Sequence, residues 1–223
     1  MHLPSHGTAF PALLLTATLA GGCASMGARR ACEPAAALRW AAAHDVGGTE
    51  HRRVVHVWMD VEADGVEGWG RSGASRVRRA IERWNALSLP VALDVATARQ
   101  TAEVTVSVIQ RFPPDKHLNA DEYRAGLTTL TYDSTGQITR ARVFIAGSTP
   151  YGMRYPVIDQ EATLLHELGH ALGLPHVSNP FALMYSRPRA TSITPVDAVL
   201  AKSVYLEKAC PRFQLAAGSP GAR

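Results

Sequence analysis

Long apolar runs and dense charge are both scarce in this chain of 223 residues. Beyond the N-terminal segment, no stretch approaches the about 20 consecutive apolar residues of a transmembrane helix, so a membrane-spanning domain is not expected. The formal net charge is only +4. No dense basic run is interleaved with aromatic residues, so nucleic-acid binding is not expected either. The length suits one domain with a sizeable core plus flanking segments.

The N-terminal segment has the composition of an export signal. Residues 10–20 are apolar apart from two threonines, and small residues follow them, which is typical of a signal peptide. We therefore expect residues 1–22 to be a signal peptide. Residues 19–23 resemble a bacterial lipobox, which predicts a lipid anchor at Cys23 in the cell envelope. Ordinary secretion, with cleavage at nearby small residues, is the alternative.

Cysteine is rare as well. Removing Cys23 leaves Cys32 and Cys210, and an even pair in an oxidising compartment predicts a disulfide. This bond would connect the start of the mature chain to its end. No cysteine lies near the histidine cluster described next.

Three histidines and a glutamate stand close together in residues 166–176, which read His-Glu-Leu-Gly-His-Ala-Leu-Gly-Leu-Pro-His. A helix places His166 and His170 on one face, one turn apart, where two imidazoles can bind one ion. Tetrahedral zinc favours such nitrogen ligands. Glu167 lies at the flank of this face and is predicted to be the general base for metal-activated water.

The end of this helix predicts the third ligand. Gly173 can adopt the left-handed conformation that ends a helix, and Pro175 forbids its continuation. The chain then turns, so His176 can reach the same ion. Three protein ligands leave one position open, which is the catalytic arrangement of zinc and not the structural one.

This pattern resembles that of the metzincin metallopeptidases. Ala182-Leu183-Met184-Tyr185 resembles their Met-turn, and its sequence is most similar to that of the matrixin branch. The resemblance implies a monomeric zinc endopeptidase acting on peptides or proteins. It also implies that Met184 packs under the metal and that Tyr185 is not a ligand. A non-catalytic zinc-bearing lipoprotein and a hydrolase of non-peptide amides are the alternatives. Cys32 could instead be an inhibitory switch, although its setting differs from the family's motif.

The remaining sequence predicts an α+β domain over residues 51–211, after a tether at 23–50 and before a disordered tail at 212–223. Its metzincin-like fold would have a mixed, twisted sheet of four to five strands, an active-site helix, the Met-turn and a C-terminal helix. Alternating apolar residues and turn signals predict strands at 53–60, 91–95, 103–110, 127–132 and 138–146, and helices at 75–87, 158–172 and 194–208.

Three further expectations concern loops and surfaces. Residues 65–73 are glycine-rich and predicted as a loop, and Arg76, Arg79 and Arg83 are predicted on a solvated helix face. The resemblance implies that the strand before the zinc helix, at about 142–147, is an edge strand to which substrate adds. Residues 112–124 hold Asp115, His117 and Asp121, which could bind a second ion; an exposed loop is favoured there.

Overall fold

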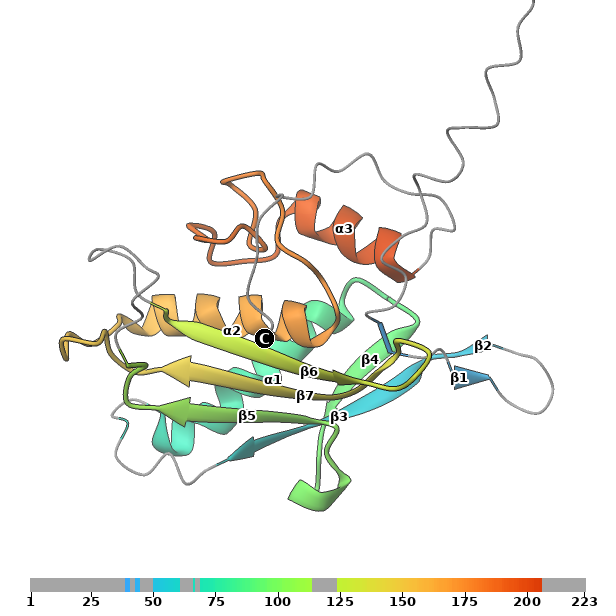
Figure 1. Cartoon of the computed structure of the whole chain (residues 1–223), viewed down its shortest axis with the longest axis horizontal. Coiled ribbons are helices and arrows are strands. Elements are labelled where there is room, and N and C mark those ends of the chain that lie inside the picture. Colours follow the sequence, from blue (N-terminus) through green and yellow to red (C-terminus); the bar gives the residue numbers. More distant parts are fainter. Residues whose placement is uncertain are drawn as a thin grey trace, which may run out of the picture. The chain divides into compact units, whose positions relative to one another are not determined.

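The computed structural model describes residues 39–40, 43–44, 50–60, 66, 69–113 and 124–205, all within the unit Glu33–Arg223 (Figure 1). Among these residues, no helix has the length and apolar character needed to cross a bilayer. The predicted signal peptide, the C-terminal tail, all three cysteines and the acidic loop with Asp115, His117 and Asp121 lie outside the described residues.

A five-stranded mixed sheet forms the centre of the fold, in the order β4-β3-β5-β7-β6. Four strands are parallel, and β6 pairs with β7 in the antiparallel direction. This confirms the predicted α+β class and strand number. The strands are β3 (Arg53–Asp60), β4 (Val91–Val95), β5 (Val104–Ile109), β6 (Gly126–Tyr132) and β7 (Ile138–Ala146). The described part also contains a separate short pair of strands, β1 (Ala43–His44) and β2 (Glu50–His51), and the 3-10 helix η1 (Arg99–Thr101).

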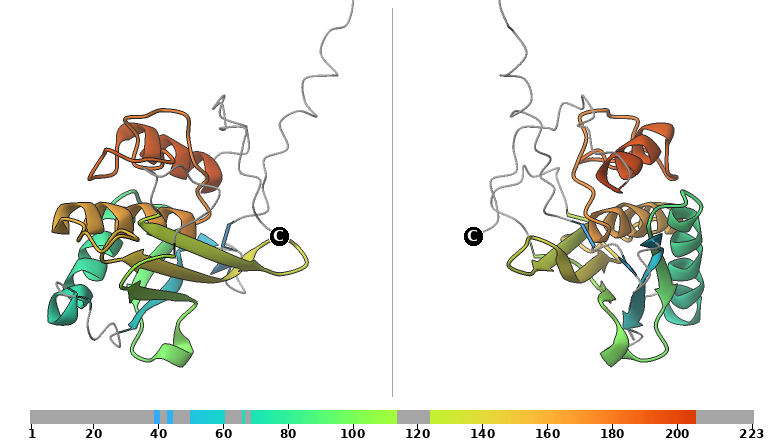
Figure 2. Two further views of the ribbon diagram at one scale, coloured as in Figure 1. Left: turned by 60° about the vertical axis from the view of Figure 1, so that its left-hand side comes forward. Right: turned by 90° about the vertical axis from the view of Figure 1, so that its right-hand side faces the viewer.

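Alternation along the strands decides which face of the sheet is buried. In β3, Val55, Val57 and Met59 are buried while the residues between them are more exposed. The valines of β5 repeat this pattern, as expected for strands with one covered face. Two helices, α1 (Gly70–Asn85) and α2 (Val157–Ala171), cover that face (Figure 2).

Helix α1 begins earlier than predicted, so the glycine-rich segment at 65–73 is not entirely a loop. Its predicted apolar stripe, including Val77, Ile81 and Trp84, is buried as expected. A Cβ at Gly73 would lie within 3 Å of the Met59 side chain. Glycine therefore serves here to bring the first turn of the helix close to β3, although in the sequence it looks like a helix breaker.

The prediction that the α1 arginines are solvated is wrong for Arg76. Its side chain is only 7% exposed, and the guanidinium lies 4.9 Å from the centre of the Trp69 ring. Its Nε is 3.7 Å from a Glu161 carboxylate oxygen, and Arg79 approaches the same oxygen at 2.6 Å. The arginine stem and planar head allow burial when a ring and a carboxylate are available. These contacts join α1 to α2.

The expectation for the edge strand is also wrong. Strand β7, which precedes α2, lies between β5 and β6, and β6 forms the edge. The tight turn at residues 133–136 leads from β6 into β7, and the parallel pairing of β7 with β5 places β7 inside and leaves β6 on the outer side. Asp133 stabilises this turn by accepting hydrogen bonds from the backbone N–H groups of Thr135 and Gln137.

The C-terminal end of α2 is held by aromatic side chains from both ends of the described chain. The Trp40 indole donates a 2.9 Å hydrogen bond to the Ala171 carbonyl. The Tyr205 hydroxyl, at the end of α3 (Pro195–Tyr205), donates one of 2.6 Å to the Leu172 carbonyl. These donors satisfy carbonyls that a helix end leaves unpaired. Trp40 is 1% exposed, although it precedes the predicted domain boundary at residue 51.

Candidate metal centre

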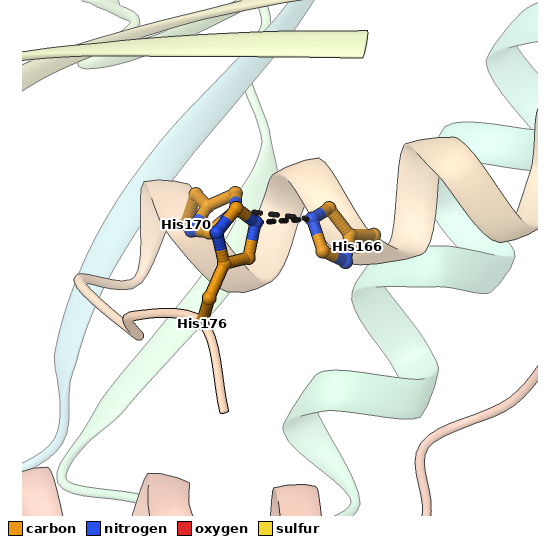
Figure 3. Close-up of side chains that lie close together, drawn as sticks. All are labelled: His166, His170 and His176. Atoms are coloured by element: carbon orange, nitrogen blue, oxygen red, sulfur yellow. Dashed lines mark hydrogen bonds between the residues drawn. The ribbon is translucent and has the colours of Figure 1, made fainter. Parts of the chain in front are cut away.

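Two of the predicted ligands lie one turn apart on α2, with their rings nearly perpendicular and close together (Figure 3). The Nε2 atoms of His166 and His170 are 3.0 Å apart. This is the arrangement expected from the i, i+4 spacing, because residues four apart stack along one side of a helix. His166 is 5% exposed, whereas His170 is half-buried, so His166 is the more enclosed of the two.

The helix ends in a Schellman motif that turns the chain back toward these rings. Gly173 has φ +87°, which is the left-handed conformation expected at this position. Its N–H bonds to the His170 carbonyl at 2.8 Å, and the Leu174 N–H bonds to the Gly169 carbonyl at 3.0 Å. The turn brings His176 to the site, with its Nε2 at 3.1 Å from His170 Nε2 and at 3.3 Å from His166 Nε2.

Two backbone carbonyls determine which ring nitrogens are available. His166 Nδ1 lies 2.6 Å from the Leu183 carbonyl, and His170 Nδ1 lies 2.7 Å from the Leu174 carbonyl. A carbonyl oxygen only accepts hydrogen bonds, so each Nδ1 must carry the proton and each Nε2 a lone pair. In neutral rings the two Nε2 lone pairs are then both directed into the space between the histidines, where these nitrogens lie 3.0 Å apart.

This triangle of nitrogens fits a tetrahedral zinc ion. Zinc–nitrogen bonds of about 2.0–2.1 Å in tetrahedral geometry separate the nitrogens by about 3.3–3.4 Å. The observed separations of 3.0, 3.1 and 3.3 Å approach that value. Burial lowers the pKa of His166 to about 4 and that of His170 to about 3, and it also lowers the pKa of His176. All three rings are therefore neutral at pH 7, which is the form that binds a metal.

Met184 packs beneath the site against α2, as the resemblance implied. It is fully buried, and a Cβ at Gly169 would lie 2.5 Å from its sulfur. The small residue in the helix thus makes room for the methionine. The Val177 N–H bonds to the Met184 carbonyl at 2.9 Å, which ties the segment after His176 to the Met-turn.

Sequence reasoning missed the residue that holds the Met-turn, Asp197 in the first turn of α3. Its fully buried carboxylate accepts hydrogen bonds from the N–H groups of Leu183 at 2.9 Å and Met184 at 2.8 Å. It also accepts bonds from the N–H and hydroxyl of Thr194. The only signal in the sequence was a helix-capping pattern, a threonine followed three residues later by an acid. Asp197 therefore supports the turn whose Leu183 carbonyl orients His166.

The Glu167 side chain is directed toward the edge strand β6, and not toward the backbone carbonyls that orient His166 and His170. It is 5% exposed, and the Thr128 hydroxyl of β6 donates a 2.6 Å hydrogen bond to its Oε2. Burial raises the pKa of Glu167 to about 7, against the lowering effects of the Thr128 hydrogen bond and the Arg124 charge. Carboxyl groups with such a pKa suit proton transfer near neutral pH. Nothing in the sequence pointed to Thr128.

The glycine turn after a two-histidine helix, the third histidine and the methionine below them together define the metzincin class of zinc metallopeptidases. The matrixin family model matches residues 71–205, more than half of the chain, and the chain accordingly belongs to the matrixin family. No curated protein matches the chain. The fold, a mixed five-stranded sheet with three helices, agrees with this membership.

Proposed function

We propose that this chain is a zinc-dependent endopeptidase in which His166, His170 and His176 hold the ion and Glu167 is the general base. The observation that carries the proposal is the triangle of Nε2 lone pairs within 3.0–3.3 Å of one another, next to a buried carboxylate on the same helix. When bound, zinc supplies Lewis acidity, which polarises a carbonyl and acidifies water at neutral pH. The Glu167 carboxylate takes the proton of the attacking water and later delivers it to the leaving amine.

The substrate would bind as an extended peptide along β6. Ala125 and Ala146 face each other as a hydrogen-bonded pair, and such pairs alternate along an antiparallel ladder. The backbone groups of Gly126, Thr128 and Leu130 consequently point away from β7, along the outer edge of the sheet. A peptide that pairs there gains a strand's hydrogen bonds. These outward-facing groups support β6, and not β7, as the strand to which the proposed substrate adds.

A non-catalytic zinc protein is the first alternative, and Glu167 argues against it. Zinc binding does not require this carboxylate, yet the fold buries it beside the ligands, at a cost that an unused carboxylate would not justify. A hydrolase of non-peptide amides would use the same groups. Only the choice of substrate separates that alternative from a peptidase.

A peptide-mixture digestion tests these proposals. We expect zinc-loaded protein to cleave internal peptide bonds, chelated protein to be inactive, and zinc to restore the activity. Glu167→Gln should bind one zinc ion per chain and cleave at least about a hundredfold more slowly. Glu82→Gln, on an exposed face of α1, is the matched control and should retain full activity. Hydrolysis by Glu167→Gln at the wild-type rate would refute the general-base role. A zinc-loaded wild type that cleaves non-peptide amides alone would establish the second alternative.

Export to the bacterial cell envelope, with a lipid on Cys23, remains part of the proposal because residues 10–23 have the composition of a lipoprotein signal. Labelling with a radioactive fatty acid should mark the wild type and not Cys23→Ser. Non-reducing mass mapping should find Cys32 linked to Cys210. A free Cys32 thiol would favour the inhibitory switch.

A further inference from the structure

Glu167 is held in place by a strand and not by its own helix. The Thr128 hydroxyl lies 2.6 Å from Glu167 Oε2 and 3.0 Å from the Glu167 backbone carbonyl. A hydroxyl has one proton, so the shorter contact to the carboxylate is the main bond and the carbonyl shares it. Both contacts reach the same residue of α2 from β6, across 39 positions of sequence.

A second residue of β6 shapes the space around the same carboxylate. A Cβ at Gly126 would lie 2.4 Å from Glu167 Oε1 and 2.6 Å from its Cγ. It would also lie 2.7 Å from the methyl group of Thr163, one turn earlier on α2. The missing side chain therefore leaves the gap that the Glu167 carboxylate fills, and any larger residue would displace the carboxylate.

The alternation of β6 explains why these two residues act together. Gly126 and Thr128 are two positions apart, so both face α2. Their backbone groups also point to the outer edge of the sheet, where a peptide would pair. Thr129, the residue after Thr128, faces the other side of the sheet and is exposed.

From these contacts we propose that Thr128 and Gly126 are positioning residues for Glu167: Thr128 fixes Oε2 by a hydrogen bond, and Gly126 provides the gap that sets the side-chain direction. The inference rests on the proposed peptidase function. It adds that the strand on which the substrate would pair also orients the general base.

Three variants test this proposal in the zinc-loaded full chain. Thr128→Val keeps the shape of the side chain and removes the donor, and it should lower kcat by about ten- to a hundredfold, the effect of one hydrogen bond to a charged group. KM should be unchanged, because backbone pairing is intact. Thr128→Ser should recover most of that loss. Thr129→Val is the matched control, and its kcat should equal that of the wild type.

Gly126→Ala gives an independent test. Its new methyl group meets the Glu167 and Thr163 side chains and no backbone atom among the nearest contacts, so the fold should tolerate it while the carboxylate moves. A displacement of about 1 Å should cost roughly a hundredfold in kcat. Zinc content should remain near the wild-type value, although the displaced Glu167 and Thr163 side chains lower the melting temperature. A merely structural role of Gly126 would predict the lower melting temperature without the loss of kcat.

Crystal structures of Thr128→Val and Gly126→Ala give a readout that does not depend on activity. We expect a rotated Glu167 side chain with the three histidines unmoved. Wild-type kcat in Thr128→Val, a loss matched by lost zinc, or an unmoved Glu167 in both structures would overturn the proposal. If the zinc-loaded wild type cleaves no peptide, the proposed function fails. The two structures then still decide whether Thr128 and Gly126 position the carboxylate.

Discussion

Replacing Asp197 by alanine is expected to weaken both the fold and the zinc site. The carboxylate is fully buried and accepts four hydrogen bonds, three of them from the backbone N–H groups of Leu183, Met184 and Thr194. The fourth comes from the Thr194 hydroxyl, which can rotate toward another acceptor. The variant leaves the three N–H groups without their acceptor.

The expected loss of stability follows from the burial of these donors. A buried donor without an acceptor costs about 1–3 kcal/mol. Leu183 and Met184 are fully buried, whereas Thr194 is half-buried and can bind water. We therefore expect Asp197→Ala to lower the free energy of unfolding by about 3–5 kcal/mol, a large share of the about 5–15 kcal/mol typical of a domain.

Asp197→Asn should lower the free energy of unfolding by less, because the two carboxylate oxygens accept different numbers of hydrogen bonds. Oδ2 accepts the bonds from Leu183 and from both groups of Thr194, while Oδ1 accepts only the Met184 N–H. An asparagine that places its oxygen at the Oδ2 position leaves only the Met184 donor unsatisfied. A loss of about 1–3 kcal/mol is expected.

The effect on zinc follows from the Leu183 carbonyl, which lies 2.6 Å from His166 Nδ1. A loosened turn releases this ring, and the loss of such an outer support typically weakens metal binding by about 10- to 100-fold. Urea unfolding of the metal-free protein measures the first effect, and competition with a chromophoric chelator measures the second. Asp94→Ala, on an exposed position of β4, is the control. If Asp197→Ala unfolds with the same free energy as Asp94→Ala, the assigned role is wrong.

Two glycines in the zinc motif should respond differently to alanine. Gly169→Ala places a Cβ 2.5 Å from the Met184 sulfur and 2.9 Å from the Trp84 ring; despite the higher helix propensity of alanine, we expect a net loss of about 1–3 kcal/mol in urea unfolding. An unchanged or raised midpoint would show that the methionine can move away. Gly173→Ala should cost about 1–2 kcal/mol because its φ is +87°, and it should weaken zinc binding in the chelator competition. Wild-type zinc affinity in Gly173→Ala would show that His176 reaches the ion without this turn.

The cluster of three histidines was predictable because its geometry is local. His166 and His170 share one helix, and Gly173 produces the turn that brings His176 back within three residues. Helical periodicity and the conformational freedom of glycine suffice for that inference. The strands were predictable for the same reason, since alternating valines and threonines mark a pleat with one covered face.

The supports of the site were not predictable, because each joins segments that are distant in sequence. Thr128 and Glu167 are 39 positions apart, and Asp197 lies 14 positions from Leu183. Their pairing depends on how β6 packs against α2 and how α3 packs against the Met-turn, which no periodicity encodes. The prediction of the edge strand was wrong for a related reason. A hairpin pattern shows that β6 and β7 pair, but it does not show which of them lies against β5.

The supports of the site come from two different parts of the chain. The rings of His166 and His170 are held by carbonyls at Leu183 and Leu174, both C-terminal to the ligands they orient. Glu167 is held from the opposite direction, by the edge strand β6. A change in the Met-turn should therefore alter zinc affinity first, whereas a change in β6 should alter proton transfer first. Because a peptide paired along β6 would contact the same strand, substrate binding would act on the general base without disturbing the ligands.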